Sequence, residues 1–287
     1  MPELPEVEIV RRSLERRLTD CVFDRVEVRA PALREPLDRA ALEALQGCRV
    51  ESLERRAKYL LIRVTSSRRE SCNILAIHLG MSGRFTVVPK DEPYARHEHL
   101  AIHLRDADGH RRGRLRLVDP RRFGQAFVLD AATWQSDRHF AHLGVEPVGD
   151  LVSEPFGGSY LESQAEGRRG PMKAFLMDAR VVVGVGNIYA SEALWRARVH
   201  PKRSVARVSI RTWNRLAEAI RGVLNDAIAE GGTTLNDFTD GEGNAGYFQV
   251  SLDVYDREGE PCRRCEGRVR RIVQSNRSTY YCPGCQR

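Results

Sequence analysis

The sequence predicts a multidomain α+β protein, on three observations. Its 287 residues exceed one typical domain, so two or three units are expected. Up to about residue 131, short alternating apolar segments follow a first helix at intervals of roughly ten residues. Beyond that point helical periodicity takes over, and a basic segment with four cysteines ends the chain. We therefore predict three domains, at residues 1–131, 132–249 and 250–287.

The first domain is expected to contain one helix and many short strands. Residues 5–18 place Val7, Val10, Leu14 and Leu18 on one helical face. Strands are predicted at Val26–Val28, Tyr59–Val64, Ile74–Leu79, Phe85–Val88, Leu100–Leu104, Leu115–Val118 and Ala126–Leu129. Short strands separated by turn signals favour an antiparallel sandwich or a barrel.

The second domain is expected to be helical, and a polar, glycine-rich linker is predicted at Val148–Arg169, between the strand-rich half and the helices. Helices are predicted at Met172–Asp178, Ile188–Arg198 and Ile210–Ala229. The last of these has Ser209 at a plausible N-cap and Gly231 at its end. The final segment, Val250–Arg287, is strand-like and basic.

Composition predicts a cytoplasmic protein with no membrane partner. Hydrophobic residues make up 41% of the chain, which is enough for a core. No apolar run approaches the roughly 18–20 residues that a membrane span needs. The first residues, Pro2-Glu3-Leu4-Pro5-Glu6, also lack the basic-then-apolar layout of a signal peptide.

The charge of the chain points to a polyanionic partner. The net charge is +7 and the pI is about 9.2. Between Cys262 and Arg287 there are seven arginines and one acid. Arginine suits planar, bidentate contacts with phosphate. A solvated run of charge would give the same composition.

Four cysteines near the C-terminus have the spacing of a zinc site. Cys262-x2-Cys265 and Cys282-x2-Cys285 are separated by 16 residues. Because all four positions are thiolate ligands, no coordination position is open, and we expect one structural Zn²⁺. Such a ribbon could equally bind protein. The remaining cysteines, at positions 21, 48 and 72, are predicted to be small core residues.

Several stretches together resemble the formamidopyrimidine glycosylase and endonuclease VIII family. They are MPELPEVE (1–8), RRAKYLL (55–61), HLGMSG (78–83), DPRRFG (119–124), HLGVEP (142–147), VVGVGNIYASEALW (182–195), GGTTL (231–235), GYFQ (246–249) and STYYCPGCQ (278–286). Each is weak alone, but their order is specific and spans the chain. The LPEVE opening favours the formamidopyrimidine-DNA glycosylase branch over endonuclease VIII, for which a GPE-type start is expected.

The resemblance implies a fold and a partner. The fold would be an N-terminal helix with a β-sandwich, a helix-two-turns-helix domain and a zinc hairpin. The partner would be damaged double-stranded DNA, bound between the two halves of a monomer. The source would be bacterial, with the protein on the nucleoid through its DNA binding.

The implied activity is that of a bifunctional DNA glycosylase and AP lyase that excises formamidopyrimidines and 8-oxoguanine. Removal of Met1 would give Pro2 a free secondary amine, and α-amino groups titrate near pKa 8, about one unit above neutrality. Such an amine can attack the sugar C1′, form a Schiff base and start β,δ-elimination. On its own, a proline after the initiator methionine could be chance.

The resemblance assigns three more catalytic residues. Glu3 would be the general acid and base, and Glu6 could support it or only charge the first helical turn. Lys58 would contact phosphate and donate a proton, and it is one of only four lysines among 46 basic residues. The alternative is a solvated strand lysine. Arg277 would grip a phosphate and assist the second elimination.

The resemblance also implies a set of DNA contacts. His78, His97 and Arg168 match contact positions, although each could be an ordinary surface residue. Asn187 follows Gly184-Val185-Gly186 at a predicted helix N-terminus, where backbone N–H groups can cradle a phosphate. The void left by the flipped base would be filled by Met81, Arg121 and Phe123. Without the resemblance, Met81 and Phe123 would be read as core residues.

The chain departs from the family pattern in the loop Gly232–Tyr247, which should close over the flipped base. Asn236 and Asn244-Ala245 stand where Lys or Arg and Lys-Pro are frequent, which puts the preference for 8-oxoguanine in doubt. Arg96-His97-Glu98-His99 replaces the usual Lys-His-Asp-His with each charge sign kept. Three alternatives remain: an endonuclease VIII-like enzyme, a non-catalytic DNA-binding zinc protein and, more distantly, a transcription-type zinc ribbon.

Overall fold

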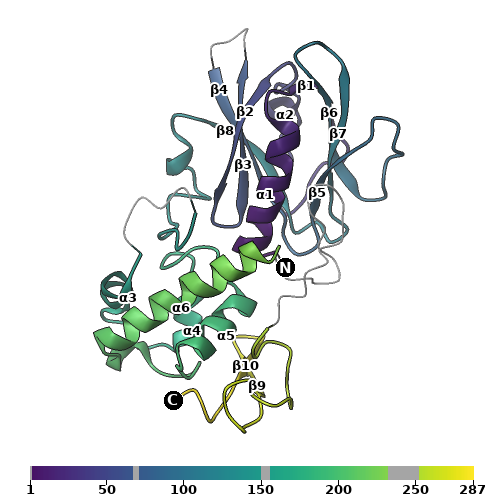
Figure 1. Cartoon of the computed structure of the whole chain (residues 1–287). Helices are drawn as coiled ribbons and strands as arrows, with labels where there is room; N and C mark the ends of the chain where they lie inside the picture. The colour runs from purple at the N-terminus through teal and green to yellow at the C-terminus, as the bar shows by residue number, and fades with distance from the viewer. Residues whose placement is uncertain (1, 67–70, 150–155, 232–251) are drawn as a thin grey trace. The chain divides into compact units, whose positions relative to one another are not determined.

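A computed structural model describes residues 2–66, 71–149, 156–231 and 252–287 (Figure 1). They form two compact units. The first ends at Ala141, and the second combines His142–Glu230 with the C-terminal segment. Across these described residues, every helix is too short or too polar to cross a membrane. The domain boundaries at residues 131 and 249 stay predictions.

The first unit opens with helix α1 (Leu4–Leu18), as predicted. Pro5 lies in its first turn, where a missing N–H costs nothing. Val7, Val10, Leu14 and Leu18 are at most 1% exposed and form one stripe that enters the core. The apolar periodicity of this segment therefore identified both the helix and its buried face.

Eight antiparallel strands follow in the order β5-β7-β6-β1-β2-β3-β4-β8. Their bounds are β1 Val22–Val28, β2 Arg49–Arg56, β3 Tyr59–Ser66, β4 Ser71–His78, β5 Arg84–Val88, β6 Glu98–Arg105, β7 Arg111–Val118 and β8 Gln125–Asp130. All seven predicted strands are present. The predicted Leu79 lies one residue beyond the end of β4.

The sheet consists of two four-stranded halves that meet at one corner. Strands β1 and β2 pair only at Val22 and Arg49, whereas β3 pairs with β4 from end to end. The halves therefore diverge beyond this corner, and their apolar side chains share one core with α1. Of the two predicted alternatives, sandwich or barrel, the first is confirmed.

Strand β2 and the short helix α2 (Arg39–Glu43) of this unit were missed. In β2 the register shifts between Val50 and Ser52, so the buried Val50 and Leu53 are three residues apart. A bulge of this kind breaks the period of two on which strand prediction depends. In α2 only Leu42 is buried, which leaves no periodicity to detect.

The second unit contains the four helices α3 (Gly158–Ala165), α4 (Met172–Leu176), α5 (Asn187–Arg196) and α6 (Ile210–Ala229). The predicted face of α6 is buried, from Trp213 to Ala227. The prediction of a linker at 148–169 was wrong for α3. This helix buries only Leu161, Ala165 and the backbone of Gly158, which lies against Asn214 of α6. So little apolar surface gives a weak sequence signal.

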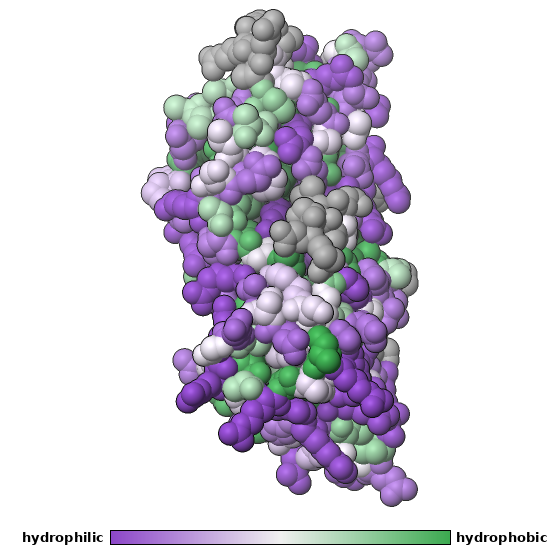
Figure 2. Space-filling view, turned by 90° about the vertical axis from the view of Figure 1, so that its left-hand side faces the viewer, coloured by the Kyte–Doolittle hydropathy of each residue, from purple (hydrophilic) through white to green (hydrophobic). Residues whose placement is uncertain are grey.

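The C-terminal segment folds into a hairpin of β9 (Arg270–Gln274) and β10 (Arg277–Tyr281). Its turn residues Ser275 and Asn276 both have positive φ, 48° and 58°, as a two-residue type I′ turn requires. Figure 2 shows one face of the molecule, where hydrophilic side chains predominate and apolar ones are scattered among them. The large apolar side chains are instead concentrated inside the two units.

Candidate functional site

The N-terminus is held by the first turn of α1. Pro2 is half-buried and Glu3 is only 2% exposed. The backbone N–H of Glu3 donates to the Glu6 carboxylate at 2.8 Å, and Glu6 itself is fully buried. Glu6 therefore fixes the backbone next to Pro2, which favours the supporting role over mere charging of the helix.

Lys58 lies in the tight turn between β2 and β3 and is half-buried. The turn needs a positive φ of 55° at Ala57, whose carbonyl accepts a hydrogen bond from Arg55 at 3.2 Å. Arg55 also pairs with Glu8 of α1 at 3.2 Å, and both side chains are almost fully buried. This pair ties the helix that begins at Pro2 and Glu3 to the turn that carries Lys58.

His78, the last residue of β4, is neutral over most of the pH range. Its Nδ1 accepts the Gly80 N–H at 3.1 Å, and its ring lies 4.8 Å from that of Tyr59. Burial lowers the pKa of His78 to about 4, and the positive charges of Lys58 and Arg34 add to this effect. Lys58 and His78 therefore belong to one electrostatic environment, and His78 acts there as a neutral hydrogen-bonding group.

Two loops of the first unit are joined by Asp119, which is fully buried. Its carboxylate accepts the Ser82 hydroxyl at 2.7 Å and the Gly124 N–H at 2.8 Å. Ser82 is next to Met81, and Gly124 is next to Phe123. Asp119 was not singled out from the sequence, although an acid at the head of DPRRFG was a visible signal.

The loops that Asp119 joins expose large apolar side chains. Met81 is 39% exposed and Phe123 is 44% exposed, and the Arg121 guanidinium lies 5.1 Å from the Phe123 ring. The alternative reading of Met81 and Phe123 as core residues is therefore wrong. Exposed apolar side chains on a fixed loop suit insertion into a base stack.

His97 closes the segment between β5 and β6 and is half-buried, with a φ of 64°. Its carbonyl accepts the Asp119 N–H at 3.0 Å. His97 is thus connected through Asp119 to the loops of Met81, Arg121 and Phe123. In the first unit, hydrogen bonds of Asp119 therefore connect the His97 backbone to the loops that carry Met81, Arg121 and Phe123.

In the second unit, Asn187 is the first residue of α5, after Gly184 with its φ of 80°. Its side-chain oxygen accepts from Lys173 at 2.7 Å, and its amide donates to the Ser278 carbonyl at 2.9 Å. Lys173 also donates to the Thr279 hydroxyl at 2.8 Å. The Asn187 side chain therefore links the start of α5 to β10. Because that side chain is already hydrogen-bonded within the protein, the groups suited to a phosphate are the backbone N–H groups of the turn at residues 184–187.

Lys173 is a functional candidate that the sequence reasoning missed. It is 1% exposed, although it is a lysine. A buried lysine requires acceptors on every side, and here they come from α5 and β10. The available signal was a lone lysine on the apolar face of the helix predicted at Met172–Asp178.

Arg277 and Arg168 differ in their surroundings. Arg277 is exposed at the start of β10 and lines a hollow of about 220 Å³ with Lys173, Met177 and Gln274. Arg168 is half-exposed and pairs with Asp178 at 3.0 Å. Hydrogen bonds from Arg180 and Arg168 lower the pKa of Asp178 to about 2.

The four C-terminal cysteines form one cluster. The sulfur atoms lie within 4.8 Å of one another, with Cys262 and Cys285 3.8 Å apart and Cys265 and Cys282 3.5 Å apart. The Arg264 N–H lies 3.4 Å from the Cys262 sulfur, a contact that stabilises a thiolate. The donor set is suited to one tetrahedral zinc ion. Of the other cysteines, Cys21 and Cys48 are buried as predicted, but Cys72 is only half-buried, near Glu51.

The cysteine segment is docked on α5 by two buried side chains. Glu192, 3% exposed, accepts the backbone N–H groups of Asp253, Val254 and Tyr255 at 2.8 to 2.9 Å. Burial raises the pKa of Glu192, although the three backbone hydrogen bonds act in the opposite direction. The Trp195 indole lies 3.4 Å from the Cys262 sulfur. The zinc cluster is therefore held against the helix that begins at Asn187.

The predictions for the loop Gly232–Tyr247, with Asn236 and Asn244-Ala245, lie outside the described residues. The residues at Arg96-His97-Glu98-His99 are described. Glu98 is buried and pairs with Arg114 at 3.1 Å, so its negative charge is used inside the first unit.

Comparison with known proteins gives consistent matches along the chain. Residues 1–126 match the formamidopyrimidine-DNA glycosylase N-terminal domain, 143–239 its H2TH domain and 259–287 the zinc finger found in FPG and IleRS. A formamidopyrimidine-DNA glycosylase of Chelativorans sp. (strain BNC1) is 45% identical over 100% of both chains. The structure is similar to a mutant of Lactococcus lactis FPG in complex with Fapy-dG-containing DNA (TM-score 0.87, 29% identity, 100% of both chains). It is also similar to wild-type L. lactis FPG (MutM) with DNA containing an oxidised pyrimidine (TM-score 0.86, 29% identity, 100% of both chains).

Proposed function

Because this chain belongs to the formamidopyrimidine-DNA glycosylase family, we propose that it removes oxidised purines and then cuts the strand with Pro2 as nucleophile. It is a DNA glycosylase for damaged bases, with a zinc finger. The finer assignment covers the purine preference, the lyase activity and the roles of individual residues. The observation that supports this finer assignment is the position of the half-buried Pro2 next to the almost fully buried Glu3, at the start of α1.

The first step is attack of the neutral Pro2 amine on C1′ of the damaged nucleotide. The new N–C1′ bond replaces the glycosidic bond, and the departing base takes up a proton. Glu3, almost fully buried next to Pro2, is the general acid of this step. Glu6 keeps the Glu3 backbone in place.

The second stage begins when the C1′–O4′ bond breaks, O4′ takes up a proton and the N–C1′ bond becomes an iminium, from which elimination proceeds. The iminium acidifies the C2′ proton, and its removal breaks the C3′–O bond on one side of the lesion. A second elimination then breaks the C5′–O bond, and hydrolysis of the imine frees Pro2. Lys58, in the turn tied to α1 through Arg55, contacts phosphate and delivers a proton, and Arg277 of β10 assists the second departure.

DNA binding is assigned to residues of both units. Met81 and Phe123 enter the space that the flipped base leaves, and Arg121 reads the orphaned partner base. His78 carries no positive charge at neutral pH, because its pKa of about 4 keeps the ring neutral, and it would contact DNA as a hydrogen-bonding group. His97, Arg168 and the turn at Asn187 contact phosphates. The enzyme acts in the bacterial cytoplasm and binds DNA as a monomer. Light scattering of the complex tests the monomeric state, because it measures the molar mass.

Zinc has a structural role in this proposal. The site would be formed by Cys262, Cys265, Cys282 and Cys285, and the bound ion would fix the hairpin that carries Arg277. Catalysis needs no further metal. Activity should therefore persist in EDTA for as long as the finger keeps its zinc, and restoration by magnesium would contradict this assignment.

The experiment that tests the proposal is a strand-cutting assay on a panel of duplexes. The lesions are 8-oxoguanine, a formamidopyrimidine, an oxidised pyrimidine and a preformed abasic site, each opposite cytosine or guanine as appropriate. Purine lesions are expected to give a one-nucleotide gap with phosphate at both ends. Faster cutting at the oxidised pyrimidine would instead favour the endonuclease VIII-like alternative. An intact strand with an abasic site would exclude the lyase step.

A further inference from the structure

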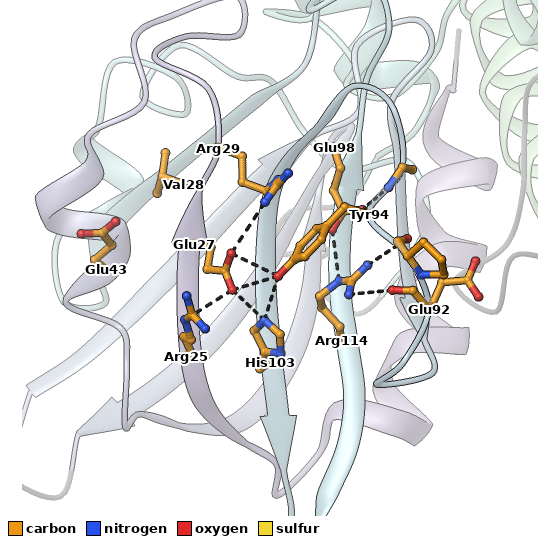
Figure 3. Close-up of polar contacts among 12 residues, drawn as sticks. Arg25, Glu27, Val28, Arg29, Glu43, Glu92, Tyr94, Glu98, His103 and Arg114 are labelled. Carbon is orange, nitrogen blue, oxygen red and sulfur yellow. Dashed lines mark hydrogen bonds and ion pairs between the residues drawn. The ribbon is translucent and has the colours of Figure 1, made fainter.

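The segment between β5 and β6 is clamped through Tyr94 by side chains of three strands (Figure 3). The Tyr94 hydroxyl donates to both oxygens of the Glu27 carboxylate, at 3.0 and 3.1 Å. His103 of β6 donates to the same carboxylate at 2.9 Å. Against the effect of burial, these two hydrogen bonds lower the pKa of Glu27, so the carboxylate stays charged and the clamp stays formed at neutral pH.

The ring of Tyr94 is held on both faces by arginines. The Arg29 guanidinium lies 3.9 Å from the ring centroid and that of Arg114 lies 4.1 Å from it. Figure 3 shows the ring between the two. Cation–π contacts are directional, so together with the hydroxyl they fix the ring. Tyr94 is nevertheless 42% exposed, so its contacts hold the segment and add little to the core.

Arg114 extends this clamp along the backbone of the segment. Its side chain is almost fully buried and pairs with Glu98. The same guanidinium donates to the carbonyls of Glu92 at 3.0 Å and Pro93 at 3.3 Å. Glu98 in turn accepts the Ala95 N–H at 2.9 Å. The backbone on either side of Tyr94 is therefore anchored to one buried ion pair.

The clamped segment ends at His97, in a left-handed conformation that is disfavoured for residues other than glycine. A residue keeps such a conformation when its neighbours leave no alternative. Here Tyr94 holds the segment before His97, and Asp119 donates its N–H to the His97 carbonyl behind it.

We infer that Tyr94 is a positioning residue that acts through His97. The clamp of Tyr94, Glu27, Arg29 and Arg114 sets the path of the segment so that the His97 side chain is presented in a DNA-contacting orientation. This inference rests on the proposed function, in which His97 contacts DNA. Tyr94 itself need not touch the nucleic acid, because its hydroxyl and both ring faces are already occupied within the first unit.

A double-mutant cycle on DNA affinity tests this inference. The variants are Tyr94→Ala, His97→Ala and the double variant, and the ligand is a duplex with a stable abasic-site analogue. We expect each single variant to raise the Kd about fivefold, and the double variant to be no weaker than His97→Ala, as coupled residues of one network behave. Tyr94→Phe keeps the ring contacts, so its Kd should stay within about twofold of the parent value.

Tyr160→Ala is the matched control for Tyr94→Ala, because it removes a half-buried tyrosine that also donates one hydroxyl hydrogen bond, to the Val181 carbonyl of the second unit. It should leave the Kd unchanged. Three outcomes would overturn the inference: a Tyr94→Ala variant with lower Tm but unchanged Kd, additive effects in the double variant, or an unchanged Kd for His97→Ala. The last outcome would also remove His97 from the proposed DNA contacts, whereas the first two leave that assignment intact.

Discussion

The Asp119 carboxylate accepts the Ser82 hydroxyl at 2.7 Å and so joins the two loops that expose Met81 and Phe123. Its second oxygen accepts the Gly124 N–H. A fully buried carboxylate with two specific donors holds both loops in one arrangement before DNA arrives. Loops fixed in this way lose little conformational entropy on binding.

Asp119→Asn should weaken this link. One side-chain oxygen is replaced by an amide that faces a donor, so we expect a loss of about 1–3 kcal/mol in the free energy of unfolding. Ser82→Ala removes only one hydrogen bond and should cost about 1 kcal/mol. Urea denaturation measures both. Equal stability of Asp119→Asn and the parent would show that the carboxylate does not hold the loops.

Lys173→Met should destabilise the second unit. The methionine keeps the apolar stem but leaves Asn187, the Ser278 carbonyl and Thr279 without their shared donor. We expect a loss of about 2–4 kcal/mol, as several buried hydrogen bonds disappear together. Lys202→Met at an exposed lysine of the same unit is the control and should change stability by less than about 0.5 kcal/mol. Similar effects at both lysines would argue against a special role for Lys173.

The low pKa of His78 should make stability depend on pH. Its folded pKa of about 4, set by burial and then by Lys58, lies below the ordinary value of 6.5. The unfolded chain therefore binds the proton first as pH falls. The free energy of unfolding is therefore highest above pH 6.5. It falls progressively towards pH 4, by about 3 kcal/mol at most.

His78→Gln should flatten the dependence of unfolding free energy on pH between 6.5 and 4. Direct titration of His78 by NMR gives a second measurement. A midpoint near 6.5 for His78 in the folded protein would contradict this prediction.

Loss of a zinc ligand should unfold the C-terminal segment. Cys282→Ser should reduce bound zinc from about one ion per chain to well below that value, because a four-coordinate structural site tolerates no missing thiolate. The half-buried Cys72 offers a matched control, and Cys72→Ser should keep its zinc. Elemental analysis and the near-ultraviolet signal of Trp195, which touches Cys262, report both changes. A Cys282→Ser protein with full zinc content would place the ion elsewhere.

Much of the fold followed from the sequence wherever apolar periodicity was strong. It identified α1, α6 and seven strands, and the CxxC pairs identified the zinc cluster. Strand β2 was missed because its bulge moves Leu53 out of step with Val50. Helix α3 was missed because it buries too little apolar surface to be distinguished from a linker.

The supporting residues of the candidate site could not be found in this way. Asp119, Lys173 and Glu192 act by accepting or donating hydrogen bonds across segments that are distant in sequence. Their roles depend on tertiary contacts, which no local pattern encodes. The resemblance to a family could point only to residues within the matching motifs, so the clamp around Tyr94 was also beyond its reach.

The most direct test of the central claim is borohydride trapping of the covalent intermediate. The protein is incubated with duplex that contains 8-oxoguanine opposite cytosine, reduced, digested and analysed by mass spectrometry. A version with residues added before Pro2 is the control, because its proline nitrogen is an amide and cannot attack. The account predicts DNA attached to the Pro2 nitrogen and no adduct for the extended chain. DNA attached to a lysine, or an adduct of equal yield with the extended chain, would contradict it.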